Sequence, residues 1–516
     1  MKNLLEYVKS RIKDLDDIFI RRLNVDDNEI NLVYNEALVD STMISNFVVR
    51  SIVECIREEK VLNEIDEKNN SLEDKINKRL GNKKDINLED TIAINKIKRV
   101  DPEQENIFYY IMSGFVLIIY KDIAYVVETR GTLTRSISEP TSENSIRGAK
   151  DSFVENIMKN IGLIRNRIKT ENLAYKEKRL GRKSKTKVGI MYITDIAKKD
   201  LVKYVEEKID KIDIDGILDV NYIQEFIEEK NDSDFPISIN TQRPDVVSYY
   251  LLQGRIVILV DNSPYALVLP AFFEDFINNI DDLYQKSKNV TFTKIIRYIS
   301  LILTILTPAL YLSLITFDQE SIPSELLTAF ATQREGVPFP AFVEAIIMIF
   351  SFEILRESDM RSNKVSGNTL SIVGALILGD AAVSAGIVSP IMIIVVAITT
   401  ISGLNFSDIN VINVLRKWRA IFMLFASLCG IIGIGIATIL FIASLVSTVS
   451  YTKPFTYPVS PLNFTEMRKN LFTRLSISKD KKRQKILTNN LTKSRWLYEK
   501  IYNCTFNNGN CFWWIK

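Results

Sequence analysis

The feature that most constrains this chain is a series of long uncharged runs between residues 298 and 452. Residues 298–317 contain no charged side chain over twenty positions, enough for a helix to cross a bilayer core of about 30 Å. Residues 381–404 and 420–452 are uncharged over 24 and 33 positions, and the second run exceeds what one upright helix requires. We therefore expect a helical transmembrane domain over residues 295–450 with about four to six spans.

The sequences on either side of these runs are charged and mixed, which is typical of water-soluble domains. The predicted fold class is an α+β and α-helical membrane protein, in which an N-terminal cytoplasmic α/β region of two subdomains precedes a polytopic helical domain and a basic tail. The expected boundaries are residues 1–170 and 188–290 for the subdomains and residues 453–516 for the tail. Residues 339–355 are apolar but short and charged, so their crossing is left open.

Charges beside the apolar runs indicate which side of the membrane each end occupies. No cleavable signal opens the chain, so the first 297 residues are expected to stay in the cytoplasm. Residues 318–337 carry four acids and one arginine, whereas residues 453–516 carry thirteen basic and three acidic residues. Because basic residues stay on the inner side, both termini are expected in the cytoplasm. An odd number of crossings would contradict this, so either residues 409–449 cross twice or one short segment is re-entrant.

Hydrophobic patterning in the front half indicates helices and strands in two pieces. Residues 30–56 and 57–100 are expected to be helix-rich, and residues 115–120 and 123–129 to form a hairpin. The second piece is expected to have strands at 188–194, 255–261 and 266–270 and helices at 195–209, 220–230 and 245–254.

A basic run lies between the two pieces, at residues 176–187. Its sequence, KEKRLGRKSKTK, holds seven basic residues and one acid. Such a run can bind nucleic acid or lipid head groups, but a solvated linker is the commoner interpretation. We therefore predict no nucleic-acid partner.

The sequence lacks most of the residues and motifs that conventional catalytic sites use. The 516 residues include no histidine, which removes histidine zinc sites, Ser-His-Asp triads and Cys-His nucleophiles. No GxxxxGK[ST] phosphate loop occurs, and the four cysteines form no ligand set. Gly430, Gly433 and Gly435 lie in an apolar run, where small residues let helices approach closely. We predict no enzymatic activity, no cofactor and no metal site.

Carboxylates inside the apolar region are the unusual feature. Glu344 and Glu353 are nine positions apart on a helix expected from Pro340, so they face opposite ways. Glu353, Arg356 and Glu357 share a face and can pair as a structural charge cluster at the inner interface. Glu344 has no such local partner. A lone carboxylate in a membrane is costly unless it faces a partner, backbone or water, so we assign Glu344 to an ion or polar pathway.

Asp380 gives the same signal in the next apolar region. It is followed by Gly386, and Ser389 and Pro390 interrupt the run after it. Pro390 removes a helix donor and can free carbonyl groups that need a wet or protein-lined setting. Broken helices of this kind are typical of ion paths, although proline kinks also occur in purely structural spans. Both interpretations stay open.

At these residues the sequence resembles the GerA family of endospore germination proteins, specifically the A subunit of nutrient germinant receptors. The likeness is carried by PFPAFVEAIIMIFSFEILRE, AGIVSPIMIIVVAIT and, in the front half, QRPDVVSYYLLQGRIVILVDNSPYALVLP. Blocks of this kind run in the same order from about residue 30 to 465. The resemblance implies a membrane subunit of a nutrient sensor in the spore inner membrane, with no enzymatic activity.

The same resemblance implies partners and a mode of action. A transporter-like B subunit is expected to hold the nutrient, and a C subunit is expected to be a lipoprotein. A-type subunits are expected to assemble as a homo-oligomeric channel through which cations leave when nutrient binds. A non-conducting scaffold and signal relay is the alternative, and a secondary transporter fits the broken helix but lacks a visible internal repeat.

Departures from the family pattern limit which residues carry over. A second family carboxylate, five positions after Glu344, is replaced by Ile349. The family's GQAAVEAG is GDAAVSAG here, which gains Asp380 and loses a carboxylate at Ser384. Residues 387–404 are the hypothesised pore-facing helix. The hypothesised ion pathway comprises Glu344, Asp380, Gly386, Val388, Ser389 and Pro390.

Overall fold

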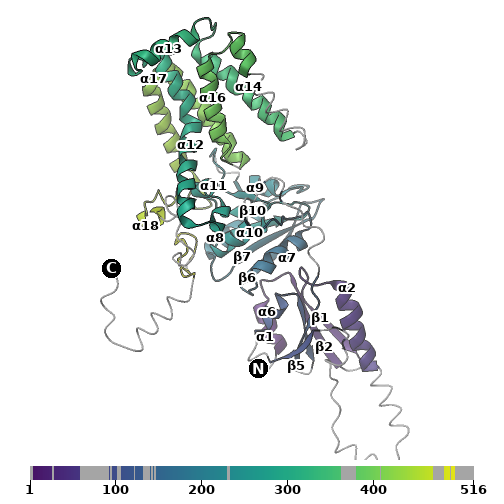
Figure 1. Ribbon diagram of the computed structural model, residues 1–516. Helices are drawn as coiled ribbons and strands as arrows, with labels where there is room; N and C mark the ends of the chain where they lie inside the picture. Colours follow the sequence, from purple (N-terminus) through teal and green to yellow (C-terminus); the bar gives the residue numbers. More distant parts are fainter. Residues whose placement is uncertain are drawn as a thin grey trace, which may run out of the picture. The chain divides into compact units, whose positions relative to one another are not determined.

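The computed structural model describes residues 4–25, 28–57, 92, 94, 96–101, 106–120, 123–131, 140, 143, 147–228, 233–361, 379–406, 408–468, 482–488 and 490–493. These residues belong to two compact units (Figure 1). Unit 1 takes the described parts of residues 1–229, 238–270 and 481–516, and unit 2 takes those of residues 230–237 and 271–480.

Unit 1 contains two five-stranded antiparallel sheets, the first in the order β1-β2-β4-β5-β3. Its strands are β1 Ile18–Val25, β2 Asn28–Asn35, β3 Ile97–Val100, β4 Phe115–Tyr120 and β5 Ile123–Glu128. Its helices are α1 Leu4–Arg11, α2 Ser41–Met43, the π-helical η1 Ile44–Val49 and α6 Ile107–Ile111.

Both faces of this first sheet are covered, because side chains alternate between the faces of a strand. Leu117 of β4 packs in one core with residues of α1 and α6. Its neighbour Val116 packs in a second core with the helical residues 41–57. The strands β4 and β5 are therefore apolar at nearly every position, as their sequences FVLIIY and IAYVVE show.

The second sheet of unit 1 has the order β6-β7-β9-β10-β8 and is also antiparallel. Its strands are β6 Leu173–Leu180, β7 Thr186–Ile193, β8 Ile239–Thr241, β9 Ile256–Val260 and β10 Ala266–Leu269. The accompanying helices are α7 Ile157–Arg167, α8 Lys199–Ile209, α9 Val220–Glu228 and α10 Pro244–Leu252. Every residue of β9 and β10 is buried, so this sheet is also covered on both faces.

Most of the elements expected in the front half are confirmed. The β4–β5 hairpin, the strands β7, β9 and β10 and the helices α8, α9 and α10 lie where the sequence placed them. The helical expectation for residues 30–56 is wrong at its start, because β2 takes residues 28–35. The expectation of helices in residues 57–100 falls mostly outside the described residues, although β3 occupies its end.

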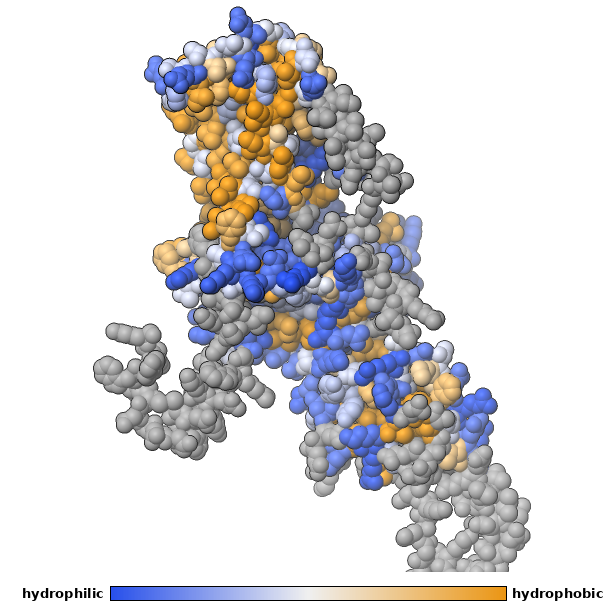
Figure 2. All heavy atoms as spheres, in the orientation of Figure 1, coloured by the Kyte–Doolittle hydropathy of each residue, from blue (hydrophilic) through white to orange (hydrophobic). Residues whose placement is uncertain are grey.

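Unit 2 is mainly helical. Its elements are α11 Phe273–Ile277, η3 Ile280–Tyr284, α12 Ser287–Thr316, η4 Gln319–Ser321, α13 Ser324–Arg334, α14 Ala341–Arg361, α16 Pro390–Gly403, α17 Ile409–Ser447, β11 Val449–Ser450, β12 Lys453–Pro454 and α18 Phe464–Met467. Within the described residues, α12 and α17 are long and apolar enough to cross a membrane, and α16 is a shorter apolar helix. Figure 2 shows the hydrophobic surface over these helices.

Helix α17 reverses direction at Gly430. That residue has φ 60° and ψ −140°, a conformation open to glycine and strained for other residues. The rings of Trp418 and Phe441, on opposite sides of Gly430, have their centroids 5.1 Å apart. The arms 409–429 and 431–447 therefore pack against each other as a helical hairpin.

The glycines near this turn have different roles. A Cβ atom at Gly433 would lie 2.0 Å from the carbonyl oxygen of Phe425, so the close helix approach expected there is confirmed. Gly430 forms the turn instead. Around Gly435 no atom outside its own helical turn lies within 4 Å of an added Cβ among the described residues, so close packing does not explain it.

The two ends of this hairpin contact different parts of unit 2. At its turn, the backbone N–H of Ile431 donates to Asp318 Oδ2 at 3.1 Å, just after α12 ends. At its base, the hydroxyls of Thr448 and Ser233 lie 2.6 Å apart, and Ser450 Oγ donates to the carbonyl of Ile237 at 3.0 Å. The chain after α17 thus returns to residues 233–237, the part of unit 2 that lies in sequence between α9 and β8.

Candidate functional site

The carboxylate of Glu344 lies at the N-terminus of helix α16. It is completely buried and accepts hydrogen bonds from the backbone N–H of Ser389 at 2.6 Å and from Ser389 Oγ at 2.5 Å. Ser389 is the N-cap residue of α16 and Pro390 follows as the first helical residue, an arrangement that favours helix initiation. An anion at a helix N-terminus is stabilised by the exposed N–H groups and the helix dipole.

Arg334, at the end of α13, supplies the nearest opposite charge. Its Nη2 lies 3.8 Å from Glu344 Oε2, and its side chain is 19% exposed whereas that of Glu344 is 0% exposed. Among the described residues, Glu344 Oε2 and Arg334 Nη1 are buried without a hydrogen-bond partner. A buried ion pair with unsatisfied atoms stabilises a fold less than a fully hydrogen-bonded one, so this contact contributes little stability to the bundle.

The other predicted pathway residues lie nearby in sequence but differ in environment. Asp380 is exposed on the short helical segment 379–384, and no hydrogen bond or ion pair within the described part of the chain joins it to Glu344. Val388 is only 2% exposed. Gly386 has φ +67°, so its importance here is conformational. The structure thus brings Glu344 together with Ser389 and Pro390 and leaves Asp380 apart.

The predicted charge cluster has partners that helix periodicity did not reveal. Glu353 pairs with Arg416 at 2.6 Å and with Arg419 at 2.7 Å, both from the first arm of α17. Glu357 instead pairs with Arg361, one turn further along α14, at 2.7 Å. Arg416 and Arg419 lie more than sixty positions from Glu353, so local helix periodicity does not reveal these contacts. Arg334 is ten positions from Glu344 but lies on a different helix, so the same periodicity does not relate them.

Unit 1 contains a buried ion pair that the sequence did not indicate. The guanidinium of Arg165, on α7, donates from Nε and Nη2 to the two carboxylate oxygens of Asp17, each at 2.8 Å, and both side chains are completely buried. Asn35 Nδ2 adds a third donor to Asp17 at 2.6 Å. This bidentate pair joins α7, which accompanies the second sheet, to the start of β1 in the first sheet.

The basic run 176–187 is an ordered hairpin with compensated charge. Six of its seven basic residues lie within 4 Å of a carboxylate oxygen. Most of these acids follow α8, and the Arg182 guanidinium lowers the pKa of Asp213 by hydrogen bonding. The expectation of a solvated linker is therefore wrong, because residues 176–180 belong to β6, residues 186–187 belong to β7, and the residues between them form the turn of the hairpin.

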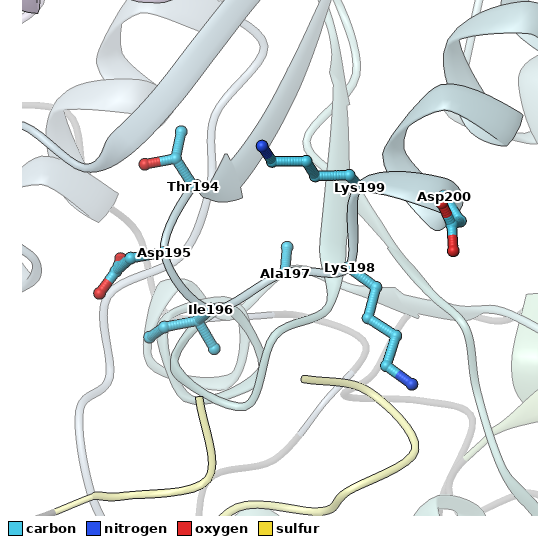
Figure 3. Close-up of a pocket in the computed structure, with 7 residues that line it drawn as sticks. All are labelled: Thr194, Asp195, Ile196, Ala197, Lys198, Lys199 and Asp200. Atoms are coloured by element: carbon cyan, nitrogen blue, oxygen red, sulfur yellow. The ribbon is translucent and has the colours of Figure 1, made fainter. Parts of the chain in front are cut away.

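A cavity of about 460 Å³ lies in unit 1 between β7 and α8. Figure 3 shows that its lining comes from one continuous segment, with the amines of Lys198 and Lys199 directed apart. No acid and base converge there as they do in a catalytic site. The lining residues are Thr194, Asp195, Ile196, Ala197, Lys198, Lys199 and Asp200.

Comparison with known families decides the identity of the chain. The family model described as "Bacillus/Clostridium GerA spore germination protein" matches residues 6–486. The chain belongs to the GerA family. The expected GerA resemblance is therefore confirmed, and the match covers both the α/β unit and the helical unit.

Relatives of this GerA family member are spore germination proteins. Spore germination protein KA of Bacillus subtilis (strain 168) is 34% identical over 478 residues, covering 91% of this chain and 84% of that protein. Spore germination protein XA of Bacillus anthracis is 36% identical over 390 residues, covering 75% and 79%. Spore germination protein GerLA of Bacillus cereus is 34% identical over 379 residues, covering 73% and 77%.

A solved structure is also similar to this GerA chain. It is the N-terminal domain of the A subunit of the Bacillus megaterium spore germinant receptor GerK3, with 28% sequence identity and a TM-score of 0.36. The similarity covers 53% of this chain and 95% of that chain. None of the relatives named above is described as an enzyme.

Proposed function

We propose that this chain is the A subunit of a nutrient-responsive spore germinant receptor and forms an oligomeric, ligand-gated cation channel. The observation that carries the proposal is the carboxylate of Glu344. It belongs to α14, is buried in the apolar bundle of a GerA protein, and lies at the N-terminus of α16. A transporter-like B subunit would bind the nutrient and a lipoprotein C subunit would complete the complex. The complex would lie in the spore inner membrane.

The hairpin of α17 supports a multi-pass topology with both termini in the cytoplasm. At about 1.5 Å per residue, its arms 409–429 and 431–447 are about 31 Å and 26 Å long, and the uncharged part of the first arm, 420–429, accounts for about 15 Å with Arg416 and Arg419 at its edge. Its turn contacts the residue that follows α12, and its base contacts residues 233–237. The arms would thus cross the membrane in opposite directions. Two crossings return the basic tail to the cytoplasmic side, so no re-entrant segment is needed.

Glu344 is enclosed in this conformation, so conduction past it requires a rearrangement. Arg334 is the charge that must move, because a guanidinium 3.8 Å from the carboxylate repels a cation from the same position. Nutrient bound to the partner subunit would favour a state in which Arg334 and Glu344 separate. Asp380 is already exposed and would face the passage shared between copies.

A double substitution tests the ion-pathway assignment. We expect Glu344→Gln with Asp380→Asn to slow potassium release from germinating spores about tenfold, corresponding to about 1.4 kcal/mol of barrier. The matched control is Glu320→Gln with Glu325→Gln, which removes two exposed carboxylates between α12 and α14. Unchanged release in the double variant, at normal protein level, would contradict the assignment.

The pore-helix assignment has its own test at Val388. A smaller side chain at this buried position would loosen the contact at the start of α16, so Val388→Ala spores should leak potassium without nutrient. Val459→Ala, at an exposed residue beyond the helices, is the control. Leak-free Val388→Ala spores would count against residues 387–404 as the pore-facing helix.

The scaffold and relay function remains the second candidate because Glu344 is enclosed within a single chain. Purified protein in planar bilayers separates the candidates. Unitary currents favour the channel, nutrient-dependent flux without unitary events favours a transporter, and absence of flux from a folded receptor complex favours the relay.

A further inference from the structure

Three arginine side chains gather around one carboxylate where α14 meets the first arm of α17. Arg416 and Arg419 each form an ion pair with Glu353, at 2.6 and 2.7 Å. Arg356, one turn after Glu353 on α14, interacts electrostatically with all three of these residues. The cluster therefore combines charges from two helices that are distant in sequence.

Positive charge is in excess in this cluster. Within the described residues, Glu353 is the one carboxylate within 4 Å of Arg416 or Arg419, and no carboxylate lies within 4 Å of Arg356. The neighbouring Glu357 is engaged by Arg361. Three guanidinium groups thus face one carboxylate, which leaves a surplus of two positive charges.

The excess charge lies in poorly solvated surroundings. Arg419 is 6% exposed at its side chain and Arg416 is 26% exposed. Arg416 Nε is buried and has no hydrogen-bond partner among the described residues. Guanidinium groups held together away from bulk water repel one another strongly, so an anion with several acceptor oxygens would stabilise the cluster.

We propose that this cluster binds the phosphate of an anionic phospholipid head group. Phosphate offers the several oxygens that forked guanidinium donors recognise. Arg416 and Arg419 immediately precede the uncharged run 420–452, and Arg356 follows the apolar stretch of α14, which places all three at the edge of the apolar region. Basic pockets between helices at this depth bind lipid phosphates. This inference concerns lipid binding and goes beyond the proposed channel.

Exposed apolar side chains on the same two helices favour a lipid over a free anion. On α14, Phe350 is 64% exposed and Ile354 is 52% exposed, and both precede Arg356 by less than two turns. On α17, Leu424 is 47% exposed and Leu428 is 63% exposed, and both follow Arg419 toward the turn. At about 100° per residue these side chains lie on other faces of α14 and α17 than Arg356 and Arg419, so they mark the lipid-facing surface from which a head group would reach the cluster.

Thermal unfolding of the full chain in detergent tests the proposal. Dihexanoyl-phosphatidylglycerol should raise Tm in a saturable way, because a ligand that binds the folded state stabilises it. Dihexanoyl-phosphatidylcholine and inorganic phosphate should each raise Tm much less at equal concentration. Equal shifts with both lipids would overturn the requirement for an anionic head group, and a full shift with inorganic phosphate would overturn the lipid assignment.

Substitution at Arg356 locates the effect, since no carboxylate of the described residues lies within 4 Å of its side chain. We expect Arg356→Gln to weaken the apparent affinity for dihexanoyl-phosphatidylglycerol about tenfold. Arg361→Gln, which removes an equal charge from the exposed end of α14, should leave the affinity unchanged. The proposal fails if Arg356→Gln binds like the unaltered chain or if Arg361→Gln weakens binding as much.

A measurement on the unaltered chain guards against misfolded variants. The protein in nanodiscs of mixed phosphatidylglycerol and phosphatidylcholine would be released and examined by native mass spectrometry. Selective retention of phosphatidylglycerol supports the site. Retention of the two lipids in proportion to their abundance overturns it.

Discussion

The basic run 176–187 and the arginine cluster around Glu353 differ in charge balance. The run looks the more basic of the two in sequence, but the cluster has the larger surplus of positive charge in the structure. The run concentrates seven basic residues in twelve positions, yet six of them lie beside carboxylates. The cluster draws its arginines from two separate helices and has one carboxylate for three of them. Charge density along the chain therefore says little about charge balance in space, which decides whether an anion is attracted.

The buried pair of Asp17 and Arg165 is the extreme case of balanced charge. We expect Arg165→Met to lower the free energy of unfolding of unit 1 by about 3–5 kcal/mol, because Asp17 would remain buried without its partner. Denaturant unfolding of the full chain, followed by protection of unit 1 from proteolysis, measures the loss. Changing Asp17 to Asn in the Arg165→Met chain should restore part of the lost free energy of unfolding. A single variant as stable as the unaltered chain would contradict this account of the pair.

Removal of Glu353 makes the imbalance of the arginine cluster larger. Glu353→Gln should lower the stability of unit 2 by about 1–3 kcal/mol, since Arg419 loses a charged hydrogen-bond acceptor and Arg416 loses its ion-pair partner. The same variant should respond more strongly to phosphatidylglycerol, with a Tm increase larger than that of the unaltered chain. Glu357→Gln is the matched control, because its partner Arg361 is largely exposed. An equal or smaller lipid response in Glu353→Gln would show that charge surplus does not govern binding.

The local pattern of apolar and polar residues was sufficient to predict much of the secondary structure. Continuous apolar runs predicted β7, β9 and β10, and amphipathic spacing predicted α8 and α9. The strand β6 was missed because its polar half, KEKRL, reads as part of a basic linker until its pairing with β7 is known. Likewise β2 carries alternating polar and apolar residues that a nearby helical pattern concealed.

Tertiary contacts explain why the candidate site was only partly predictable. The sequence singled out Glu344 as a carboxylate that needs a partner, and it marked Ser389 and Pro390 as an interruption. That these features meet depends on the packing of α14 against α16, over 45 positions of chain. Arg334 lies on a third element and entered only as a loop charge. From the sequence, Gly430 was interpreted as a helix-packing residue, because glycine allows both close helix contacts and turns with positive φ.

The basic hairpin should show the smallest effects of all. Arg182→Gln with Lys183→Gln removes two charges that are already paired and largely exposed, so we expect no measurable change in Tm and none in binding to vesicles of mixed phosphatidylglycerol and phosphatidylcholine. Reduced vesicle binding would mean that the run attracts anions despite its acidic neighbours.

The converse substitution gives the sharper test of charge compensation in the hairpin. Asp213→Asn with Asp215→Asn removes the acids that face Arg182 and Lys183 and should leave stability nearly unchanged. It should create salt-sensitive binding to the same anionic vesicles, because the exposed basic groups then lack nearby carboxylates. Vesicle sedimentation at low and high salt measures the gain. If binding stays absent, compensation by acids is not what keeps this run from anionic surfaces, and its shape or its distance from the membrane must be responsible.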